Sequence, residues 1–344
     1  MNEPFLKALF RKRSPYFSVL PYNLNWMLPG RDALVSRGLA SPVVLVDVGC
    51  RGGLPEELWP IKRMIQLVGF DADEKECARL STEAHELFSR SIYPLFVGGR
   101  DGESEFHLYQ SKGDSSALPP NPRYAELIGG PRFAIEETIP VKTTTLDSFF
   151  SANPDLPRPD MLKLDTQGTE LDILKGAVKC LETCSLVEAE VEFFPMYKDQ
   201  PLFHDVMGFM LDQGFELLHL NRVFSQRRGF QGFSKGQITF GDALFVRRED
   251  RLDRFDEQRL MRLAILLVNY GYLDLAHNLL ATKTFHAADR AFLESYLKQR
   301  IDRWSVRRMK RAMIPLIDKL ALALLHLRRH NSLTFDSDRS WPSR

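Results

Sequence analysis

The chain has 344 residues, of which 44% are hydrophobic and 26% charged, an ordinary balance for a globular protein long enough for two domains. The formal net charge of +1 gives no basis for nucleic-acid binding through overall electrostatics. No window of about 20 apolar residues occurs, and the N-terminal stretch lacks the apolar region of a secretory signal, so we expect a cytoplasmic protein with reduced thiols. The cysteines, which show no metal-ligand spacing, are Cys50, Cys77, Cys180 and Cys184.

An N-terminal extension and one strong strand come first. Residues 1–40 mix aromatic residues with prolines, and we expect them to pack as an extension on the main domain. From Val43 to Val46 the chain is a continuous apolar, β-branched run, which is typical of a buried parallel strand. Asp47 follows at the carboxyl end of this strand, and ligands of open α/β sheets bind just outside such ends.

A glycine-rich turn follows this strand and is expected to lead into a helix. Glycine lets a ligand approach more closely than a Cβ atom permits, as in nucleotide sites. The spacing of Gly49, Gly52 and Gly53 does not fit the dinucleotide pattern G-x-G-x-x-G. The D-x-G start at the end of the strand, Asp47 to Gly49, is more typical of S-adenosylmethionine sites, in which the glycines face the methionine part of the ligand. A purely structural glycine turn is the alternative.

A second apolar strand, Leu67–Phe70, ends in an acidic pair. Asp71 lies about one βαβ step after Asp47, the spacing at which an acidic residue binds the ribose hydroxyls of a nucleotide. Asp71 is the candidate for this role because it comes directly after the strand. Asp73 is instead expected to cap the helix that follows.

The third strand, Ser91–Val97, is not followed by a simple helix. Two alternating stretches, Glu105–Tyr109 and Ile139–Thr145, indicate a β-hairpin with a long loop, inserted over the active edge of the sheet. Ser115 and Ser116 lie in a polar turn of this loop. They are either ligand contacts or ordinary turn residues.

The stretch Met161–Glu170, MLKLDTQGTE, is the most informative in the chain. Its short apolar run suits a buried strand that stops at Asp165, after which the chain turns. Thr169 is expected to begin a helix that continues to Leu181, with Asp172 in the capping-box position. Asp165 therefore lies where ligands bind in an open α/β sheet.

A fifth strand, Leu186–Val191, carries alternating acidic residues. The alternation sends Glu188, Glu190 and Glu192 to one face, and at least one of them is expected to reach the cleft of Asp165. A helix and two further strands then close the domain, which we place at residues 41–249. These elements are Phe203–Leu211, Phe215–Leu220 and Ala243–Val246.

Residues 250–330 show helical periodicity without a strand signal, and we expect a helical C-terminal region. Its last helix, Ile314–Leu327, is amphipathic and has basic flanks, which suits contact with a membrane surface or a partner. A solvated basic face is the alternative. Residues 331–344 are polar and expected to be disordered. The basic flanking residues are Arg307, Arg308, Lys310, Arg311, Arg328 and Arg329.

Several strings together resemble the FkbM-type methyltransferases, a family of class I S-adenosylmethionine-dependent enzymes. The strongest is LKLDTQGTELDILKGA at Leu162–Ala177, and the resemblance covers about residues 43–247. It implies a Rossmann-like α/β fold whose seven-stranded, mostly parallel sheet has its last strand antiparallel. It also implies cofactor contacts at Asp47, Gly49 and Asp71, with which we group Cys50, Gly52, Gly53 and Ala72. The other strings are VDVGCRGG, VGFDAD, TTLDSF, EVEFFPMYKDQPLF and GDALFV.

Methyl transfer from a sulfonium to an oxygen atom is an in-line displacement, so catalysis depends on positioning. A carboxylate that deprotonates the acceptor hydroxyl contributes roughly 10²–10⁴-fold. Asp165 is the first candidate for this base and Glu190 the second. The same carboxylates, with Glu192, are oxygen ligands that suit Mg²⁺ as an alternative means of acidifying the hydroxyl. The residues do not decide between base and metal.

The resemblance favours an oxygen acceptor in a sugar, a glycan or a polyketide-like small molecule, selected by the 98–145 insertion and the C-terminal helices. Two other classes stay open. An NAD(P)-dependent oxidoreductase would begin with a similar βαβ unit, although the glycine spacing and the two closing strands argue against this class. A non-catalytic scaffold would bind a partner or membrane through its basic C-terminus. The acceptor atom and the oligomeric state are not fixed by these residues.

Overall fold

The computed structural model describes residues 35–36, 39–232, 234 and 236–301. The expectations for the N-terminal extension, the basic last helix and the C-terminal tail fall wholly or mostly outside the described residues.

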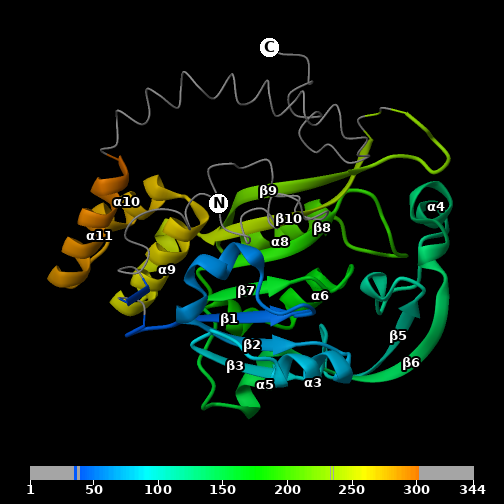
Figure 1. Ribbon diagram of the computed structural model, residues 1–344, viewed down its shortest axis with the longest axis horizontal. Helices are drawn as coiled ribbons and strands as arrows, with labels where there is room; N and C mark the ends of the chain where they lie inside the picture. Colours follow the sequence, from blue (N-terminus) through cyan, green and yellow to red (C-terminus); the bar gives the residue numbers. More distant parts are fainter. Residues whose placement is uncertain (1–34, 37–38, 233, 235, 302–344) are drawn as a thin grey trace.

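The main sheet has seven strands in the order β3-β2-β1-β7-β8-β10-β9 (Figure 1). All of its pairings are parallel except those of β10, which runs antiparallel to both of its neighbours. The expected mostly parallel sheet with an antiparallel last strand is therefore confirmed. The strands are β1 Val43–Val48, β2 Ile65–Phe70, β3 Ser89–Tyr93, β7 Met161–Leu164, β8 Leu186–Glu192, β9 Phe215–Ser225 and β10 Gln237–Arg247.

Helices cover both faces of this sheet, and each face has its own apolar core. One core joins β1 and β2 to the C-terminal helices, so that Leu45 lies in the same cluster as Leu263 and Leu267 of α9. The other core joins the opposite face to the helices between β6 and β9. The helices are α3 Glu74–Thr82, α5 Leu146–Ala152, α6 Glu170–Lys175, α7 Val178–Leu181, α8 Phe203–Asp212, α9 Glu257–Tyr270, α10 Leu273–Thr282 and α11 Ala287–Ile301.

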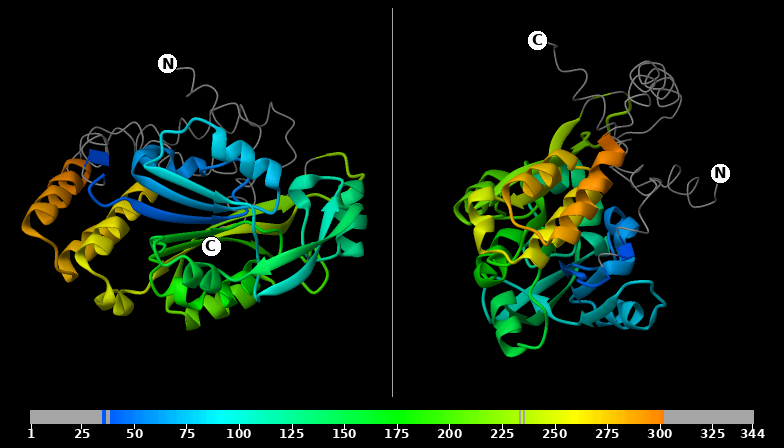
Figure 2. Two further views of the ribbon diagram at one scale, coloured as in Figure 1. Left: turned by 90° about the horizontal axis from the view of Figure 1, so that it is seen from below. Right: turned by 90° about the vertical axis from the view of Figure 1, so that its left-hand side faces the viewer.

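The C-terminal helices α9 to α11 lie at one end of the molecule (Figure 2). Helical structure in this part of the chain is confirmed, and α9 ends at Gly271, whose φ of +88° suits glycine. The boundary that we expect near residue 250 stays a prediction.

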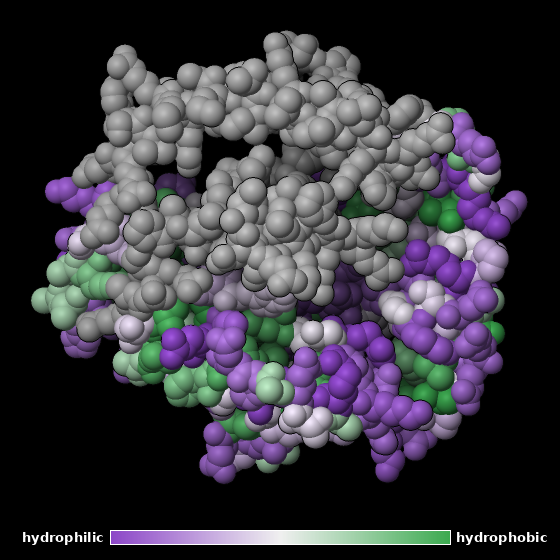
Figure 3. Space-filling model, in the orientation of Figure 1, coloured by the Kyte–Doolittle hydropathy of each residue, from purple (hydrophilic) through white to green (hydrophobic). Residues whose placement is uncertain are grey.

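A second, three-stranded sheet in the order β4-β6-β5 lies at the opposite end (Figure 2). It contains the expected hairpin, formed by β5 Gly102–Tyr109 and β6 Ile135–Thr144. Hydrophilic residues predominate on this end of the molecule in the view of Figure 3. The single third strand Ser91–Val97 was wrong: β3 ends at Tyr93 and β4, Phe96–Val97, joins the second sheet. Pro94 between them has no N–H to continue the ladder.

Two expected helices also differ from the structure. The glycine turn leads into a 3-10 helix, η3 Glu56–Met64, rather than an α-helix, because Pro60 lies inside it. The helix expected to reach Leu181 is interrupted between α6 and α7. At the break, a Cβ atom on Gly176 would lie 3.0 Å from the carbonyl oxygen of Gly98, so glycine permits this close backbone contact.

Candidate active site

Four sequence candidates lie in a row at the carboxyl edge of the main sheet. Asp71 follows β2, Asp47 is near the end of β1, Asp165 follows β7 and Glu190 is near the end of β8. These four strands are consecutive neighbours in the sheet. The fold therefore brings together acidic side chains that are up to 143 positions apart in the chain.

The glycine turn holds the end of β1 against the end of β7. Gly49 has a φ of +83°, and a Cβ atom there would lie 2.1 Å from the carbonyl oxygen of Asp165. The backbone N–H groups of Gly49 and Cys50 both donate to the carbonyl of Phe70, over 2.9 and 3.0 Å. These two amides are thus engaged within the protein. Gly52, by contrast, has open space around its Cβ position.

The turn after β2 is built around two acidic residues. Asp71 accepts a hydrogen bond from the backbone N–H of Asp73 over 2.8 Å, and Ala72 lies between them. Asp73 caps α3 by accepting from the N–H groups of Lys75 and Glu76, as expected from the sequence. Burial raises the pKa of Asp71, against the effect of the Asp73 N–H and of Arg51.

Lys163 lies among the carboxylates of the sheet edge, and the sequence analysis missed it. Its Nζ is 3.9 Å from Oδ1 of Asp47 and 3.5 Å from Oδ2 of Asp165. Burial alone would lower the pKa of Lys163, but Asp165, Asp47 and other carboxylates raise it above its ordinary value. The lysine sits within the string LKLD, where the alternation of β7 puts it beside Asp47.

Asp47 is buried, and its Oδ1 has no hydrogen-bond partner among the described residues. Burial raises its pKa to about 6, with Lys163 opposing this shift. A buried, unsatisfied acceptor at a strand end is costly unless something donates to it. Asp47 and Asp71 therefore suit a ligand with hydrogen-bond donors, whereas glycine at position 49 is required by the close contact with the carbonyl of Asp165.

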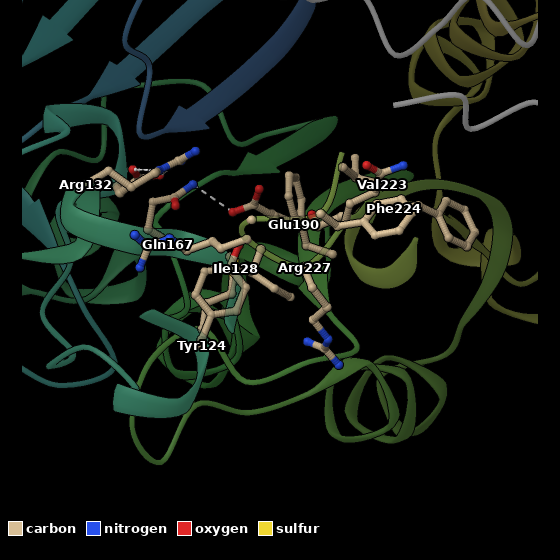
Figure 4. A pocket seen from close by; sticks show the side chains of 17 residues that line it. Tyr124, Ile128, Arg132, Gln167, Glu190, Val223, Phe224 and Arg227 are labelled. Atoms are coloured by element: carbon tan, nitrogen blue, oxygen red, sulfur yellow. Dashed lines mark hydrogen bonds and ion pairs between the residues drawn. The ribbon is translucent and has the colours of Figure 1, made fainter. Parts of the chain in front are cut away.

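Gln167 connects the two candidate catalytic residues, and it too was missed. Its Nε2 donates to Oε2 of Glu190 over 2.8 Å (Figure 4). The same nitrogen also donates to Oδ1 of Asp165 over 3.2 Å. Tyr197 donates to its Oε1 over 3.1 Å. The backbone of Gln167 has a φ of +59°, which is uncommon outside glycine. The sequence does not contain this angle, so it gave no signal for the role of Gln167.

The other acidic residues of this edge differ in their roles. Glu170 accepts from the backbone N–H groups of Thr166 and Gly168, over 2.7 and 3.0 Å, so it stabilises the turn. The expected capping box was wrong, because Thr169 makes no side-chain capping bond and its hydroxyl lies 2.9 Å from that of Thr166. Burial raises the pKa of Glu170 to about 7.

Glu190 and Glu192 are both buried. Burial, first of all, raises the pKa of each well above its ordinary value, and neighbouring carboxylates including Asp165 add to the shift. This direction favours the protonated form of Glu190, in which the carboxyl can donate a hydrogen bond.

Ser115 and Ser116 are used in turn chemistry, one of the two readings of the sequence. The Ser115 hydroxyl accepts from the N–H of Tyr109 over 3.2 Å. The buried Ser116 hydroxyl donates to the carbonyl of Gln167 over 2.7 Å and accepts from the N–H of Leu118 over 3.0 Å. Ser116 thereby ties the inserted second sheet to the turn after β7.

A pocket of about 830 Å³ opens beside these residues (Figure 4). Glu190 and Gln167 line it from the main sheet, and Tyr124 and Ile128 line it from the insertion. The remaining wall comes from the end of β9, the loop after it, and β10. The pocket is large enough for a small-molecule acceptor and exposes Glu190 to it.

In the described part of the chain, no group of three or more His, Cys, Asp or Glu side chains is placed to hold a metal ion. None of the described helices has the length and apolar character needed to cross a bilayer.

Comparison with known proteins finds a family match over the middle of the chain. Residues 61–217 match the family described as Methyltransferase FkbM domain. This range contains Asp71, Asp165 and Glu190, whereas Asp47 and the glycine turn precede it.

Two curated relatives are similar over less than half of the chain. The 2-O-methyltransferase NoeI of Sinorhizobium fredii is 25% identical over 167 residues, covering 46% of this chain and 65% of that protein. The hexuronic acid methyltransferase AglP of Haloferax volcanii is 30% identical over 148 residues, covering 43% and 55%. Both matches span less than two thirds of the relative. The solved methyltransferase FkbM of Methylobacillus flagellatus is 13% identical, with a TM-score of 0.34, over 60% of this chain and 43% of that one.

Proposed function

Because the chain carries a methyltransferase domain of the FkbM family over residues 61–217, we propose that it is an S-adenosylmethionine-dependent O-methyltransferase. The proposed acceptor is a hydroxyl on a sugar, a glycan or a polyketide-like small molecule. The relatives support this choice, since one is named a 2-O-methyltransferase and the other a hexuronic acid methyltransferase. Neither the oxidoreductase nor the non-catalytic scaffold is favoured by these matches.

The observation that carries the proposal is the row of carboxylates at the sheet edge, which leads from Asp71 and Asp47 to a pocket at Glu190. Asp71 would bind the ribose hydroxyls, and Asp47 with the turn at Gly49 would bind the methionine part of the cofactor. Bound S-adenosylmethionine supplies an electrophilic methyl group. Cys50, Gly52, Gly53 and Ala72 would flank it, while Ser115 and Ser116 would act through the turns that they stabilise.

In the proposed mechanism the two candidate carboxylates have different roles. Asp165 has a side chain that is 45% exposed and lies beside Lys163, so it is the base that takes the acceptor proton. Glu190 is buried and held by Gln167, so its role is to orient the acceptor through a hydrogen bond. Positioning the hydroxyl oxygen in line with the methyl group is the main contribution of these residues.

The proposed mechanism uses a carboxylate base and needs no metal ion. It therefore predicts that methyl transfer is unchanged after dialysis against EDTA and after addition of Mg²⁺. If EDTA abolished methyl transfer and Mg²⁺ restored it, a metal ion rather than a carboxylate base would activate the acceptor hydroxyl. A reducing compartment such as the cytoplasm suits the chain, because all four cysteines are free and buried.

The test is calorimetric titration of the purified protein with S-adenosylhomocysteine. We expect micromolar binding that weakens by roughly 10–100-fold in Asp71→Asn, since charge-assisted hydrogen bonds to ribose are lost. Asparagine keeps the acceptor for the N–H of Asp73, so the turn is preserved. Asp155→Asn, an exposed site at the other edge of the sheet, is the matched control and should bind normally. A folded protein that binds no S-adenosylhomocysteine would refute the proposal.

A further inference from the structure

The pocket beside Glu190 is lined by both arginines and aromatic side chains. Arg132, Arg227 and Arg228 line it, together with aromatic side chains such as Tyr124 and Phe240. Phe230 also lines it and is 50% exposed. A few polar groups among aromatic walls are what fix the orientation of a small ligand. The charges of these polar groups therefore indicate the charge of the ligand.

Two acidic residues, Asp114 and Glu190, also line the pocket, but only Arg132 forms an ion pair with one of them. Asp114 is committed to Arg132, which donates through Nε over 2.6 Å and through Nη2 as a second, parallel bond. In such a bidentate pair the charges of Arg132 and Asp114 compensate each other. Glu190 accepts a hydrogen bond from Gln167, and burial raises its pKa well above the ordinary value, which disfavours its charged form.

Arg227 and Arg228 thus remain as the cationic groups of the pocket, and neither forms an ion pair with a carboxylate of the described residues. Arg227 donates to the amide oxygen of Gln237 over 2.5 Å, and its guanidinium lies 5.6 Å from the ring centre of Phe194. Arg123 stacks on the same ring at 5.5 Å. Two like charges are thereby held at one aromatic ring, an arrangement that an anion would stabilise.

Arg228 is held against the wall of the pocket. A Cβ atom on Gly130 would lie 3.1 Å from its Nε, so the side chain packs directly over the glycine backbone. Its own backbone N–H donates to the carbonyl of Leu127 over 2.8 Å. These contacts join the β9–β10 loop to the inserted second sheet and fix the start of the arginine side chain, while the residue stays exposed.

We propose that this pocket binds an anionic sugar, whose oxyanion pairs with Arg228 and Arg227 while its hydroxyl lies at Glu190. The inference rests on the proposed function and narrows its acceptor. A guanidinium binds a carboxylate or a phosphate through the same planar fork, so the shared chemistry is a sugar oxyanion. The aromatic side chains provide the apolar surface on which the sugar ring packs.

The experiment is calorimetric titration of the whole chain, saturated with S-adenosylhomocysteine, with three kinds of probe. These are oligouronates of glucuronic, galacturonic and mannuronic acid, the same oligouronates with their carboxylates methyl-esterified, and hexose phosphates. The variants are Arg228→Gln and Arg227→Gln. Arg63→Gln is the matched control, because it is exposed on η3 at the opposite edge of the sheet.

We expect at least one anionic probe to bind roughly 10-fold or more tightly than its uncharged counterpart, with the difference shrinking at high salt. Arg228→Gln should remove most of this preference and Arg227→Gln part of it, while Arg63→Gln leaves it intact. Whether oligouronates or hexose phosphates bind better identifies the oxyanion. Equal binding of charged and uncharged probes, or of none, by a protein that still binds S-adenosylhomocysteine would overturn the inference. Failure to bind S-adenosylhomocysteine would instead refute the proposed function.

Discussion

The ammonium group of Lys163 lies 3.9 Å from Oδ1 of Asp47, a buried oxygen with no hydrogen-bond partner among the described residues. Lys163 is also 3.5 Å from Asp165 and pairs across the strands with Glu188. One partly buried cation thus faces acidic groups on three adjacent strands. Its removal would leave these acids without compensation in a region of low dielectric.

Lys163→Met should lower the free energy of unfolding by roughly 3–5 kcal/mol at pH 8, the usual cost of breaking a buried charge pair. The deficit should shrink at pH 5, because burial raises the pKa of Asp47 to about 6 and that of Glu188 to about 8. Below both values these carboxyls are neutral and need no cation. Urea unfolding at the two pH values measures this, with the exposed Lys175→Met as control. A deficit independent of pH would contradict this electrostatic role.

Alanine substitutions at two glycines of one turn can separate the cost of steric overlap from the cost of a left-handed backbone conformation. Gly49 and Gly52 have φ values of +83° and +85°, but only at Gly49 would a Cβ atom overlap the carbonyl of Asp165. Gly52→Ala should therefore cost only about 1–2 kcal/mol, the penalty of the left-handed conformation. Gly49→Ala should cost at least about 3 kcal/mol and weaken S-adenosylhomocysteine binding, since it separates β1 from β7. Thermal unfolding and calorimetry compare the two, and equal effects would contradict the steric argument.

The strands and the row of acidic residues were predictable because they depend on local pattern. Apolar runs that end in aspartate indicate buried parallel strands, and parallel strands place their ends at one edge. Asp47, Asp71 and Asp165 are brought together in this way. The end of β3 before Pro94 could also have been predicted, because proline has no N–H group to continue the hydrogen-bond ladder.

The pocket and its charges could not be predicted, because they depend on contacts between distant segments. Arg228 reaches the pocket only because the β9–β10 loop packs on the insertion near Gly130. The acid–base states of Glu190 and Glu170 depend on burial, which alternation alone does not give. Gln167 becomes a bridge only through its unusual φ, and a sequence pattern does not contain that angle.

Glu188 allows the effect of burying a carboxylate on the free energy of unfolding to be measured away from the pocket. It accepts a hydrogen bond from Tyr270 of α9 over 3.0 Å, and burial, first of all, raises its pKa to about 8. A carboxyl whose folded pKa is raised binds more protons when folded, so its contribution to stability falls as pH rises from about 4.5 to about 8.

Glu188→Gln keeps an acceptor for Tyr270 and cannot ionise. The variant should equal the parent protein at pH 5 and be more stable by on the order of 2 kcal/mol at pH 8.5. Thermal unfolding across this range measures the difference. The exposed Glu137→Gln should show no such trend. A variant that is less stable at high pH would mean that the ion pair with Lys163 outweighs burial.

Asp165 and Glu190 share Gln167 as a neighbour, yet they should respond differently to neutral replacements. Asp165→Asn removes the proposed base and should lower kcat by roughly 10²–10⁴-fold. Glu190→Gln keeps the size of the side chain and an oxygen that accepts from Gln167, and it changes a positioning group rather than the proposed base, so it should lower kcat less than about 10-fold. Methyl-transfer kinetics at pH 7, with S-adenosylhomocysteine affinity as the control for folding, compare the two. The opposite order would make Glu190 the base and assign Asp165 to positioning.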